Sequence, residues 1–369
     1  MEDLYRFHSD IISWTREYCT DAKILERRSN IVPRISIAPM VDISDRHFRY
    51  FCRLLTKKSM LYTEMITSST IMNRDRNKAL DFNPLEKPIA LQIAGCDKKE
   101  IAEALKIAED WDYDEINLNV GCPSDRVSGN QMGATLMAYP EMVAEIVQAM
   151  KNETKKPITV KNRIGIDGTN ILPDSLSKVV FDQYEDLEHF IKVLSDVGIK
   201  HFIIHARIAI LEGLSPKENR EIPPLRYDEV YKIKEAFPDL FIEINGGIRT
   251  IDSIRDHLRY VDGVMLGRVA YENPFFLTEV DQFFPGGKVN HISRREVIEK
   301  LIDYVEVFSG DKNMGQQSLK SILGLFHNKR GSRLWRQIIT PPWEESINAR
   351  DVLEKALSVL PEEVLDERY

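Results

Sequence analysis

The 369-residue sequence contains only four cysteines, Cys19, Cys52, Cys96 and Cys122, and no two of them form a C-x-x-C pair. This scarcity excludes a disulfide-stapled scaffold and a cysteine zinc module, and it indicates reduced thiols. No apolar run approaches the ~18 residues that a membrane-spanning helix needs. The amino terminus has no apolar stretch behind a basic cluster, so we expect no secretory signal. The sequence thus predicts a cytoplasmic protein without a membrane partner.

An excess of basic residues is absent as well, since 50 Lys and Arg stand against 58 Asp and Glu, a formal net charge of −8. This balance excludes a protein that coats nucleic acid non-specifically, but not one with a local basic surface. The sequence has no Walker loop, no H-E-x-x-H helix and no Ser-His-Asp spacing, and we predict no metal site. Its 43% hydrophobic and 29% charged residues are typical of a globular chain, and its length suits one large and one smaller domain.

Eight short β-rich runs recur along the chain, and each is followed by a stretch that leaves room for a crossover helix, as parallel strands require. The runs are Ser36–Met40, Leu61–Met65, Ile89–Ile93, Glu115–Gly121, Ile158–Arg163, His201–Arg207, Phe241–Gly247 and Gly263–Arg268. Eight such units predict an α/β fold, namely a TIM (β/α)8 barrel.

After Pro285-Gly286-Gly287 the chain has no further β-rich run, and its pattern is helical. Ser293-x-x-Glu296 is a capping box that predicts a helix to about Phe308. Two further predicted helices are Leu319–Phe326 and Ala349–Leu360. The predicted domains are a polar extension of unassigned role at 1–33, the barrel at 34–285 and an all-helical domain at 286–369.

Polar or otherwise special residues stand at the ends of all eight runs, where a TIM barrel carries its chemistry. They are Ala38-Pro39-Met40, Glu64, Gln92, Asn117, Asn119, Cys122, Lys161, Arg163, His205, Arg207, Asn245-Gly246-Gly247 and Gly267-Arg268. Each of them alone is explained as well by a capped loop or a satisfied side chain. Their presence at every strand end favours a functional site.

The last two strand ends predict a phosphate site. Asn245-Gly246-Gly247 offers backbone amides without obstructing side chains, and Gly267-Arg268 adds amides and a guanidinium. The alternative is that these glycines only serve tight turns. Gln92 could bond a heterocycle and Lys161 could place a positive charge beside it, unless that lysine is a structural ion-pair partner. A phosphorylated planar ring that can hold negative charge suits this set, and reduced FMN is such a species.

Cys122 is the candidate proton donor. Gly121 and Pro123 flank it and would fix the loop, and a thiol with an ordinary pKa of about 8.5 is mostly protonated at neutral pH. The structural alternative is an inert, small core residue. Cys96 is the rival thiol, but the Asp97-Lys98-Lys99 that follows it is typical of an exposed helix start.

Six motifs carry a resemblance: Ala38-Pro39-Met40, Leu61–Met65, Glu115–Ser124, Lys161-x-Arg163-Ile164-Gly165, Ile204–Arg207 and Ile244–Ile248. Together they resemble the tRNA-dihydrouridine synthases. Gly213–Leu225, read GLSPKENREIPPL, is similar to the DusA subfamily, which acts on the 20/20a uridines of the tRNA D-loop. The resemblance covers about residues 34–340. It implies an FMN barrel with a C-terminal helical domain, NADPH as reductant and tRNA as substrate.

The resemblance also implies roles for individual residues. FMN would be held by Ala38, Pro39, Met40, Gln92, Lys161, His205, Asn245, Gly246, Gly247, Gly267 and Arg268. Cys122 would donate a proton to C5 of the uracil while hydride passes from flavin N5 to C6, and Asn119 would lie beside the base. The expected tRNA contacts are Lys217, Arg220, Arg333 and Arg336. No metal, membrane or oligomer is required.

Two features depart from the family pattern. Asn162 stands where the subfamily usually has His, which bears on fine tuning near the flavin. The segment Asp167–Asp182 is longer than is typical, and we assign it no role.

A basic run in the C-terminal part predicts how an acidic chain binds a polyanion. Between Lys312 and Arg336 there are six Lys or Arg and no Asp or Glu. A solvated face usually mixes both signs, so this run favours a tRNA surface. Arg333 and Arg336 would share one face of a helix, with Trp335 beneath.

Two other functions fit parts of the sequence. An FMN barrel that reduces a small pyrimidine or an enone would need no basic helical domain. A non-catalytic tRNA-binding module would not need Cys122.

Overall fold

The computed structural model describes residues 34–123, 132–173, 175–308, 312–344 and 346–368, and the chain from Arg34 onwards forms one compact unit. The predicted extension at 1–33 lies outside the described residues. Because this unit includes both the predicted barrel and the predicted helical domain, the boundary at residue 285 stays a prediction.

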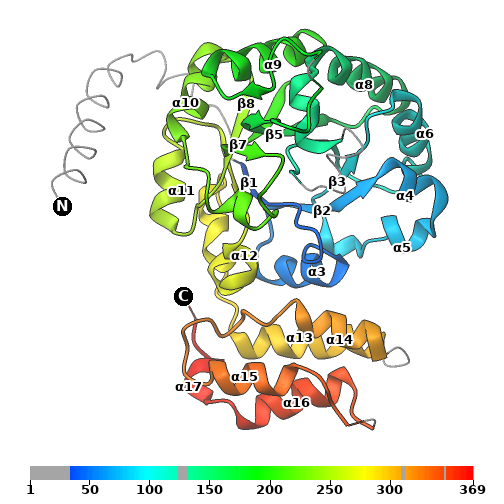
Figure 1. The fold of residues 1–369 in the computed structure, drawn as a ribbon. Coiled ribbons are helices and arrows are strands. Elements are labelled where there is room, and N and C mark those ends of the chain that lie inside the picture. Colours follow the sequence, from blue (N-terminus) through cyan, green and yellow to red (C-terminus); the bar gives the residue numbers. More distant parts are fainter. Residues whose placement is uncertain (1–33, 124–131, 174, 309–311, 345, 369) are drawn as a thin grey trace, which may run out of the picture. The chain divides into compact units, whose positions relative to one another are not determined.

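The parallel strands are β1 (Arg34–Ile37), β2 (Met60–Thr67), β3 (Ile89–Ala94), β4 (Glu115–Val120), β5 (Ile158–Asp167), β7 (His201–Ile210), β8 (Phe241–Asn245) and β9 (Gly263–Leu266). β1 pairs with both β2 and β9, and β4 pairs with both β3 and β5, so the ring of strands is closed. Helices surround this ring (Figure 1). All eight predicted runs are strands, which confirms the TIM barrel.

The helices of the barrel part are α3 (Arg46–Leu55), α4 (Ser68–Asn73), α5 (Arg76–Leu80), α6 (Lys98–Ala108), α8 (Pro140–Glu153), α9 (Tyr184–Asp196), α10 (Tyr227–Ala236), α11 (Ile251–His257) and α12 (Val269–Glu272). Four 3-10 segments, η1 (Pro84–Glu86), η2 (Gly133–Ala138), η3 (Glu218–Arg220) and η4 (Pro274–Phe283), complete it. Local sequence sets their ends. The Asp97 carboxylate accepts the amides of Lys99 and Glu100 at the start of α6, and Pro140 occupies the first turn of α8.

Successive side chains along each strand point alternately to the apolar core around the barrel and to the barrel interior. In β4, Ile116, Leu118 and Val120 belong to the large apolar core, whereas Glu115 and Asn117 lie on the opposite face. A second, small cluster joins residues of five strands or strand ends: Ala38, Tyr62, Ala90, Ile203 and Met265. Side chains from so many strands can meet only inside the barrel. The polar residues that share their face, such as Glu115 opposite Ala90, therefore also point inward.

A buried ionic network fills the amino-terminal end of the barrel, which we call the floor network: Arg34, Ser36, Tyr62, Glu115, His201 and Glu243. The Arg34 guanidinium pairs with Glu115 at 2.8 Å and approaches Glu243 at 3.5 Å. Tyr62 donates its hydroxyl to Glu115 at 2.6 Å. Ser36 donates to Glu243. Arg34 thus compensates the charge of two buried carboxylates. His201 Nε2 also lies 3.1 Å from the Glu243 carboxylate.

The segment after β5 is folded rather than a simple loop. β6 (Val180–Phe181) returns antiparallel against Ile166 and Asp167. A side chain at Gly165 would lie 2.3 Å from the Phe181 carbonyl oxygen, so glycine is required for this close approach. Leu172 of the same excursion is buried. No structure was predicted from the sequence for this segment, Asp167–Asp182.

The chain after residue 293 is helical, as predicted, with α13 (Arg294–Glu306), α14 (Lys312–Lys320), α15 (Ser332–Ile339), α16 (Ala349–Val359) and α17 (Glu362–Leu365). The Ser293–Glu296 capping box is present. The prediction of a helix over Leu319–Phe326 is wrong, because α14 ends at Lys320 and turns follow. Gly324 explains the break: a side chain there would lie 2.2 Å from the Tyr271 carbonyl oxygen, where the turn packs against the barrel part.

Helix α3 of the barrel part contacts helices α13 and α14. Tyr304 of α13 stacks on Tyr50, with ring centroids 3.9 Å apart, and its hydroxyl bonds His47 Nδ1 at 2.9 Å. Gln317 of α14 donates to the Asp45 carboxylate at 2.9 Å. These contacts join the helical segment to the loop that follows β1.

Candidate active site

The Cys122 loop follows β4 directly and is held by one side chain. The Asn119 carboxamide oxygen accepts the amide of Gly121 at 3.1 Å and that of Cys122 at 3.0 Å. A side chain at Gly121 would come within 3.3 Å of the β5 backbone at Lys161 and Asn162, so the loop lies close against that strand. Cys122 is half-buried. Ser124 lies outside the described residues.

Side-chain carboxamides of β3 and β4 form hydrogen bonds with one another inside the barrel, next to the Cys122 loop. Gln92 donates to Asn117 at 2.7 Å and accepts from Asn119 at 2.8 Å. Gln92 and Asn117 face each other in register across the strand pair. The two neighbouring carboxamides therefore fix the orientation of Gln92, the predicted ring-binding residue.

Lys161 brings a cation into the barrel beside the Cys122 loop. It is in register with Asn119 on one side and with Ile203 on the other, and its ammonium donates to Asn245 at 3.4 Å. Within the described residues Lys161 forms no ion pair. Burial, together with the neighbouring Arg163 charge, lowers the pKa of Lys161 to about 8. The structural-partner interpretation of this lysine is thus not supported.

β7 and β8 place His205 and Asn245 side by side in register. Gly246, with φ +123°, packs against His205: a side chain there would meet the imidazole Cδ2 at 2.8 Å. Burial, and then the charges of Arg163 and Lys161, hold the pKa of His205 well below its ordinary value. The ring is therefore neutral at physiological pH and can act as a hydrogen-bond partner rather than as a charge.

Arg163 joins the Cys122 loop to the loop that follows β7. Its guanidinium donates to the Gly121 carbonyl at 3.2 Å and to the Asn219 carbonyl at 2.9 Å. Burial lowers the pKa of Arg163 to about 9. A charge on the Cys122 sulfur would favour the cationic forms of both Arg163 and Lys161, and these cations would reciprocally stabilise a thiolate.

Arg268 and Gly267 follow β9 at the predicted phosphate site. The Arg268 guanidinium pairs with Glu221 at 2.9 Å and donates to the Arg220 carbonyl at 3.2 Å. In this structure it thus binds the loop after β7, and its predicted phosphate contact stays a prediction. A side chain at Gly267 would come no closer than 4.0 Å, to Ala38. The Gly267 backbone therefore has room beside it for at least a methyl group.

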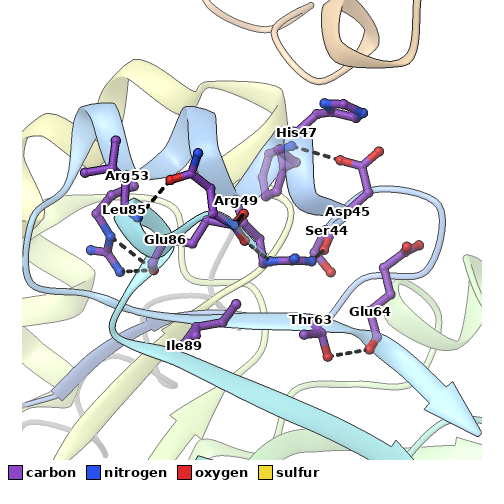
Figure 2. A network of polar contacts seen from close by, with 12 residues as sticks. Ser44, Asp45, His47, Arg49, Arg53, Thr63, Glu64, Leu85, Glu86 and Ile89 are labelled. Carbon is purple, nitrogen blue, oxygen red and sulfur yellow. Dashed lines mark hydrogen bonds and ion pairs between the residues drawn. The ribbon is translucent and has the colours of Figure 1, made fainter. Parts of the chain in front are cut away.

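The loop after β1, which contains the predicted Pro39 and Met40, is anchored by polar contacts (Figure 2). Glu64 accepts the amide of Asp42 at 2.6 Å, and Asp42 has the left-handed φ of 63°. Arg49 of α3 donates to the Ser44 carbonyl at 2.8 Å and pairs with Glu86 at 2.6 Å. The strand-end residue Glu64 thus shapes the loop beside Ala38, a role that the sequence pattern did not indicate.

The four predicted tRNA contacts, Lys217, Arg220, Arg333 and Arg336, are all exposed. Arg333 and Arg336 lie on α15, one turn apart, and Trp335 between them is fully buried against Phe326. Three other bases of the run have partners: Lys329 pairs with Glu367, Arg330 pairs with Glu363, and Lys320 donates to the Asp42 carbonyl. Within the described residues, Arg333 and Arg336 form no ion pair.

Asn162, the departure from the family pattern, is fully buried on β5. It donates to the Arg163 carbonyl at 2.8 Å, while its own carboxamide oxygen has no partner among the described residues. The side chain faces away from Lys161 along the strand, so its influence on the site acts through Arg163.

The residues present fit a phosphorylated ring with an anionic edge. Lys161, which has no carboxylate partner within the described residues, supplies the cation that such an edge requires. The buried Nε of Arg207 has no partner in the described part of the chain, and no heavy atom would crowd a methyl group at Gly267. No group of three or more His, Cys, Asp or Glu among the described residues could hold a metal ion.

Sequence reasoning missed two residues that shape the site. Tyr227 donates its hydroxyl to the Gly246 carbonyl at 2.7 Å and so fixes the glycine turn. Asn219, fully buried, bonds the Ile210 backbone in both directions and closes the loop after β7. The only signal for Asn219 was its place in GLSPKENREIPPL, and Tyr227 gave none.

Comparison with known proteins identifies similar chains. The family model described as "Dihydrouridine synthase (Dus)" matches residues 36–358. A tRNA-dihydrouridine(20/20a) synthase of Synechocystis sp. is 49% identical over 313 residues, which cover 85% of this chain and 90% of that protein. The Pseudomonas putida protein with the same name is 44% identical and covers 89% and 94%.

A solved 2-naphthoyl-CoA reductase complex superposes with a TM-score of 0.50 at 10% identity, covering 69% of this chain and 51% of that one. At this identity the likeness concerns the fold alone. None of the described helices is long and apolar enough to cross a membrane.

Proposed function

Because the chain belongs to the dihydrouridine synthase family, we propose that it is an FMN-dependent, NADPH-using enzyme that reduces the C5=C6 bond of uridines 20 and 20a in the tRNA D-loop to 5,6-dihydrouridine. The printed names of similar proteins support this substrate. The observation that carries the proposal is Lys161, an unpaired cation held between the Cys122 loop and Asn245.

The flavin would be held by residues of β5, β7 and β8 together with the ends of β9, β1 and β3. Lys161 would face the anionic edge of the reduced ring and stabilise it, while neutral His205 would bond it without adding charge. The Gly246 and Gly247 amides and the Gly267 backbone would receive the phosphate. Ala38, Pro39, Met40 and Gln92 would complete the cofactor site. Bound reduced FMN would supply the hydride that C6 of the uracil ring accepts.

The remaining chemistry belongs to the protein. Negative charge that develops at C5 and O4 of the uracil requires a proton from an acid, and we assign this to the Cys122 thiol. Breaking the S–H bond leaves a thiolate, which Lys161 and Arg163 would stabilise until solvent returns a proton. Asn119 holds the thiol in place through the loop amides and would lie beside the base.

The tRNA would contact two regions: Lys217 and Arg220 after β7, and Arg333 with Arg336 on α15. Arginine suits this role because its planar fork pairs with phosphate and base edges. A base stacked in folded tRNA must be flipped out to enter the barrel, at a cost of a few kcal/mol. We further propose that the barrel at 34–285 and the helices at 286–369 act as catalytic and tRNA-binding domains, and that the protein acts in the cytoplasm.

The test is direct production of dihydrouridine. Purified protein would be examined for flavin absorbance, supplied with NADPH and an unmodified tRNA, and the tRNA digested for nucleoside mass spectrometry. We expect bound FMN and dihydrouridine at positions 20 and 20a. Lys161→Met should weaken flavin retention, because it removes the unpaired cation without removing the volume of the side chain.

A matched pair of variants separates the alternatives. Cys122→Ala should retain flavin and its reduction by NADPH but form little dihydrouridine, whereas Cys96→Ala should behave like the parent. A protein that takes up no flavin would contradict the proposal. A flavin protein that reduces free uracil or an enone but not tRNA would support the small-molecule reductase instead.

A further inference from the structure

A chain of side-chain hydrogen bonds begins at the floor network and runs up through the barrel. The Glu115 carboxylate accepts the hydroxyl of Thr159 at 2.8 Å. The Thr159 oxygen in turn accepts the carboxamide N–H of Asn117 at 2.8 Å. Glu115 is the first residue of β4 and Thr159 the second of β5. The chain therefore starts at the end of the barrel opposite the reacting groups.

The chain continues to the Cys122 loop. The Asn117 oxygen accepts from Gln92, the Gln92 oxygen accepts from Asn119, and the Asn119 oxygen accepts the backbone amides of Gly121 and Cys122. We call the set Glu115, Thr159, Asn117, Gln92 and Asn119 the interior chain. All five are buried, with relative exposures between 0% and 7%.

Both ends of the interior chain fix its direction. A carboxylate can only accept hydrogen bonds, and a backbone N–H can only donate them. Thr159 must therefore donate to Glu115, which leaves its oxygen to accept from Asn117, and the same logic orients Gln92 and Asn119. Although burial opposes ionisation, Arg34 holds the pKa of Glu115 below its ordinary value, so this end stays an acceptor. Aligned bonds of this kind polarise and strengthen one another.

We propose that Thr159 and Glu115 are positioning residues for the Cys122 loop. They orient the Gln92 and Asn119 amides, and through Asn119 they hold the Cys122 backbone. Each of these two amides then retains one N–H that the interior chain does not use, so that donors rather than acceptors are offered to a carbonyl-rich ring. The consequence for reaction rate rests on the proposed function, but the consequence for the loop does not.

Thr159→Val tests this, because it removes the hydroxyl while keeping the shape of the side chain. Thr159→Ser keeps the hydroxyl and should rescue. Thr135→Val makes the same chemical change at a buried threonine whose hydroxyl has no partner among the described residues, and it is the matched control. If Thr159→Val does not fold, Thr159→Ala makes the same cut with a smaller side chain.

Two readouts are needed. Hydrogen exchange read by mass spectrometry should show faster exchange in the peptide covering 119–123 of Thr159→Val, with the β8 peptide unchanged, whether or not flavin is bound. In rapid kinetics on tRNA, Thr159→Val should lower kcat about 10-fold or more with little change in KM, since a small misplacement of a reacting group is costly. Reduction of the bound flavin by NADPH should not change.

Unchanged exchange at 119–123 in Thr159→Val, or equal changes in Thr135→Val, would overturn the proposal. So would loss of flavin reduction in proportion to tRNA turnover, because this would indicate general damage to the barrel. A parent protein that modifies no tRNA would contradict the proposed function, and the exchange measurement would still decide the role of Thr159.

Discussion

Replacing Arg34 by methionine should lower the free energy of unfolding more than the loss of an exposed ion pair does. The change removes the arginine that pairs with both carboxylates of the floor network but keeps most of the apolar stem, and it leaves the His201 contact with Glu243 in place. Glu115 and Glu243, which are only 3% and 0% exposed, would then both lose the Arg34 charge that compensates them. Arg350→Met is the matched control, since Arg350 also pairs with two carboxylates, Glu306 and Glu354, but at the surface.

The structure sets the expected magnitude. Removing one partner of a buried ion pair costs about 3–5 kcal/mol, and because two carboxylates lose their cation we expect the upper end of this range for Arg34→Met. The exposed Arg350 pairs should contribute about 0–1 kcal/mol. For a chain of this size, 1 kcal/mol corresponds to about 2 °C in Tm, so the buried variant should melt roughly 10 °C lower and the control within about 2 °C of the parent.

The pH dependence gives a second check on Arg34→Met. In the parent, the pKa of Glu115 lies below its ordinary value, so the ion pair stabilises above that ordinary pKa and this contribution is lost as the pH falls. In Arg34→Met the burial of Glu115 is no longer offset by that cation and favours its protonated form, so acid should relieve the variant. The Tm difference should therefore be larger at about pH 8 than at about pH 5. Calorimetry that found equal losses for Arg34→Met and Arg350→Met, or a difference that grew in acid, would refute this reasoning.

Three further outcomes are expected. Gly246→Ala should lose flavin retention, because the new methyl group would meet the His205 ring at 2.8 Å and φ is +123°; Gly213→Ala, whose φ is also positive but which has open space, is the control, and equal flavin content in both would count against the His205 contact. Cys122→Ser should lower the rate of dihydrouridine formation by ~10²–10⁴, as loss of a general acid does, with the NADPH half-reaction unchanged in stopped-flow absorbance; a near-parent rate would remove Cys122 from its role. Arg333→Glu/Arg336→Glu should raise the KM for tRNA and flatten the log-affinity against log-salt slope by roughly one unit per lost phosphate contact, whereas Arg255→Glu/Arg259→Glu, on α11 and in the turn that follows it, should change neither; an unchanged slope in the first double variant would place tRNA elsewhere.

The barrel could be predicted from the sequence because parallel strands covered on both faces appear as short apolar runs, and their polar ends mark the mouth. Lys161, His205 and Asn245 lie on the successive strands β5, β7 and β8, so strand order brings Lys161 and His205 each beside Asn245; their roles toward a cofactor stay predictions. Elements set by long-range contact could not be predicted. The helix expected over Leu319–Phe326 fails at Gly324, where the backbone must approach Tyr271.

The strand residues that support the site from below could not be predicted for a similar reason. Thr159 and Asn117 have neither unusual spacing nor a motif of their own in the sequence, and their importance depends on facing each other across β4 and β5. Arg268 shows the reverse case: its position after β9 was predicted, but not its pairing with Glu221. Local pattern identifies which residues reach the barrel mouth, whereas their partners depend on loops far away in the sequence.

The contacts of α14 with the loop after β1 bear on how the helices after residue 293, which we propose bind tRNA, could be exchanged between relatives. Gln317 bonds Asp45, and Lys320 bonds the Asp42 carbonyl in the turn that Glu64 holds. A chimera that took only the helices after residue 293 from a relative would set foreign side chains against this turn. The part to be exchanged is therefore discontinuous in sequence, because it comprises those helices together with residues 40–50. A chimera that takes only one of the two segments would break the contacts between them.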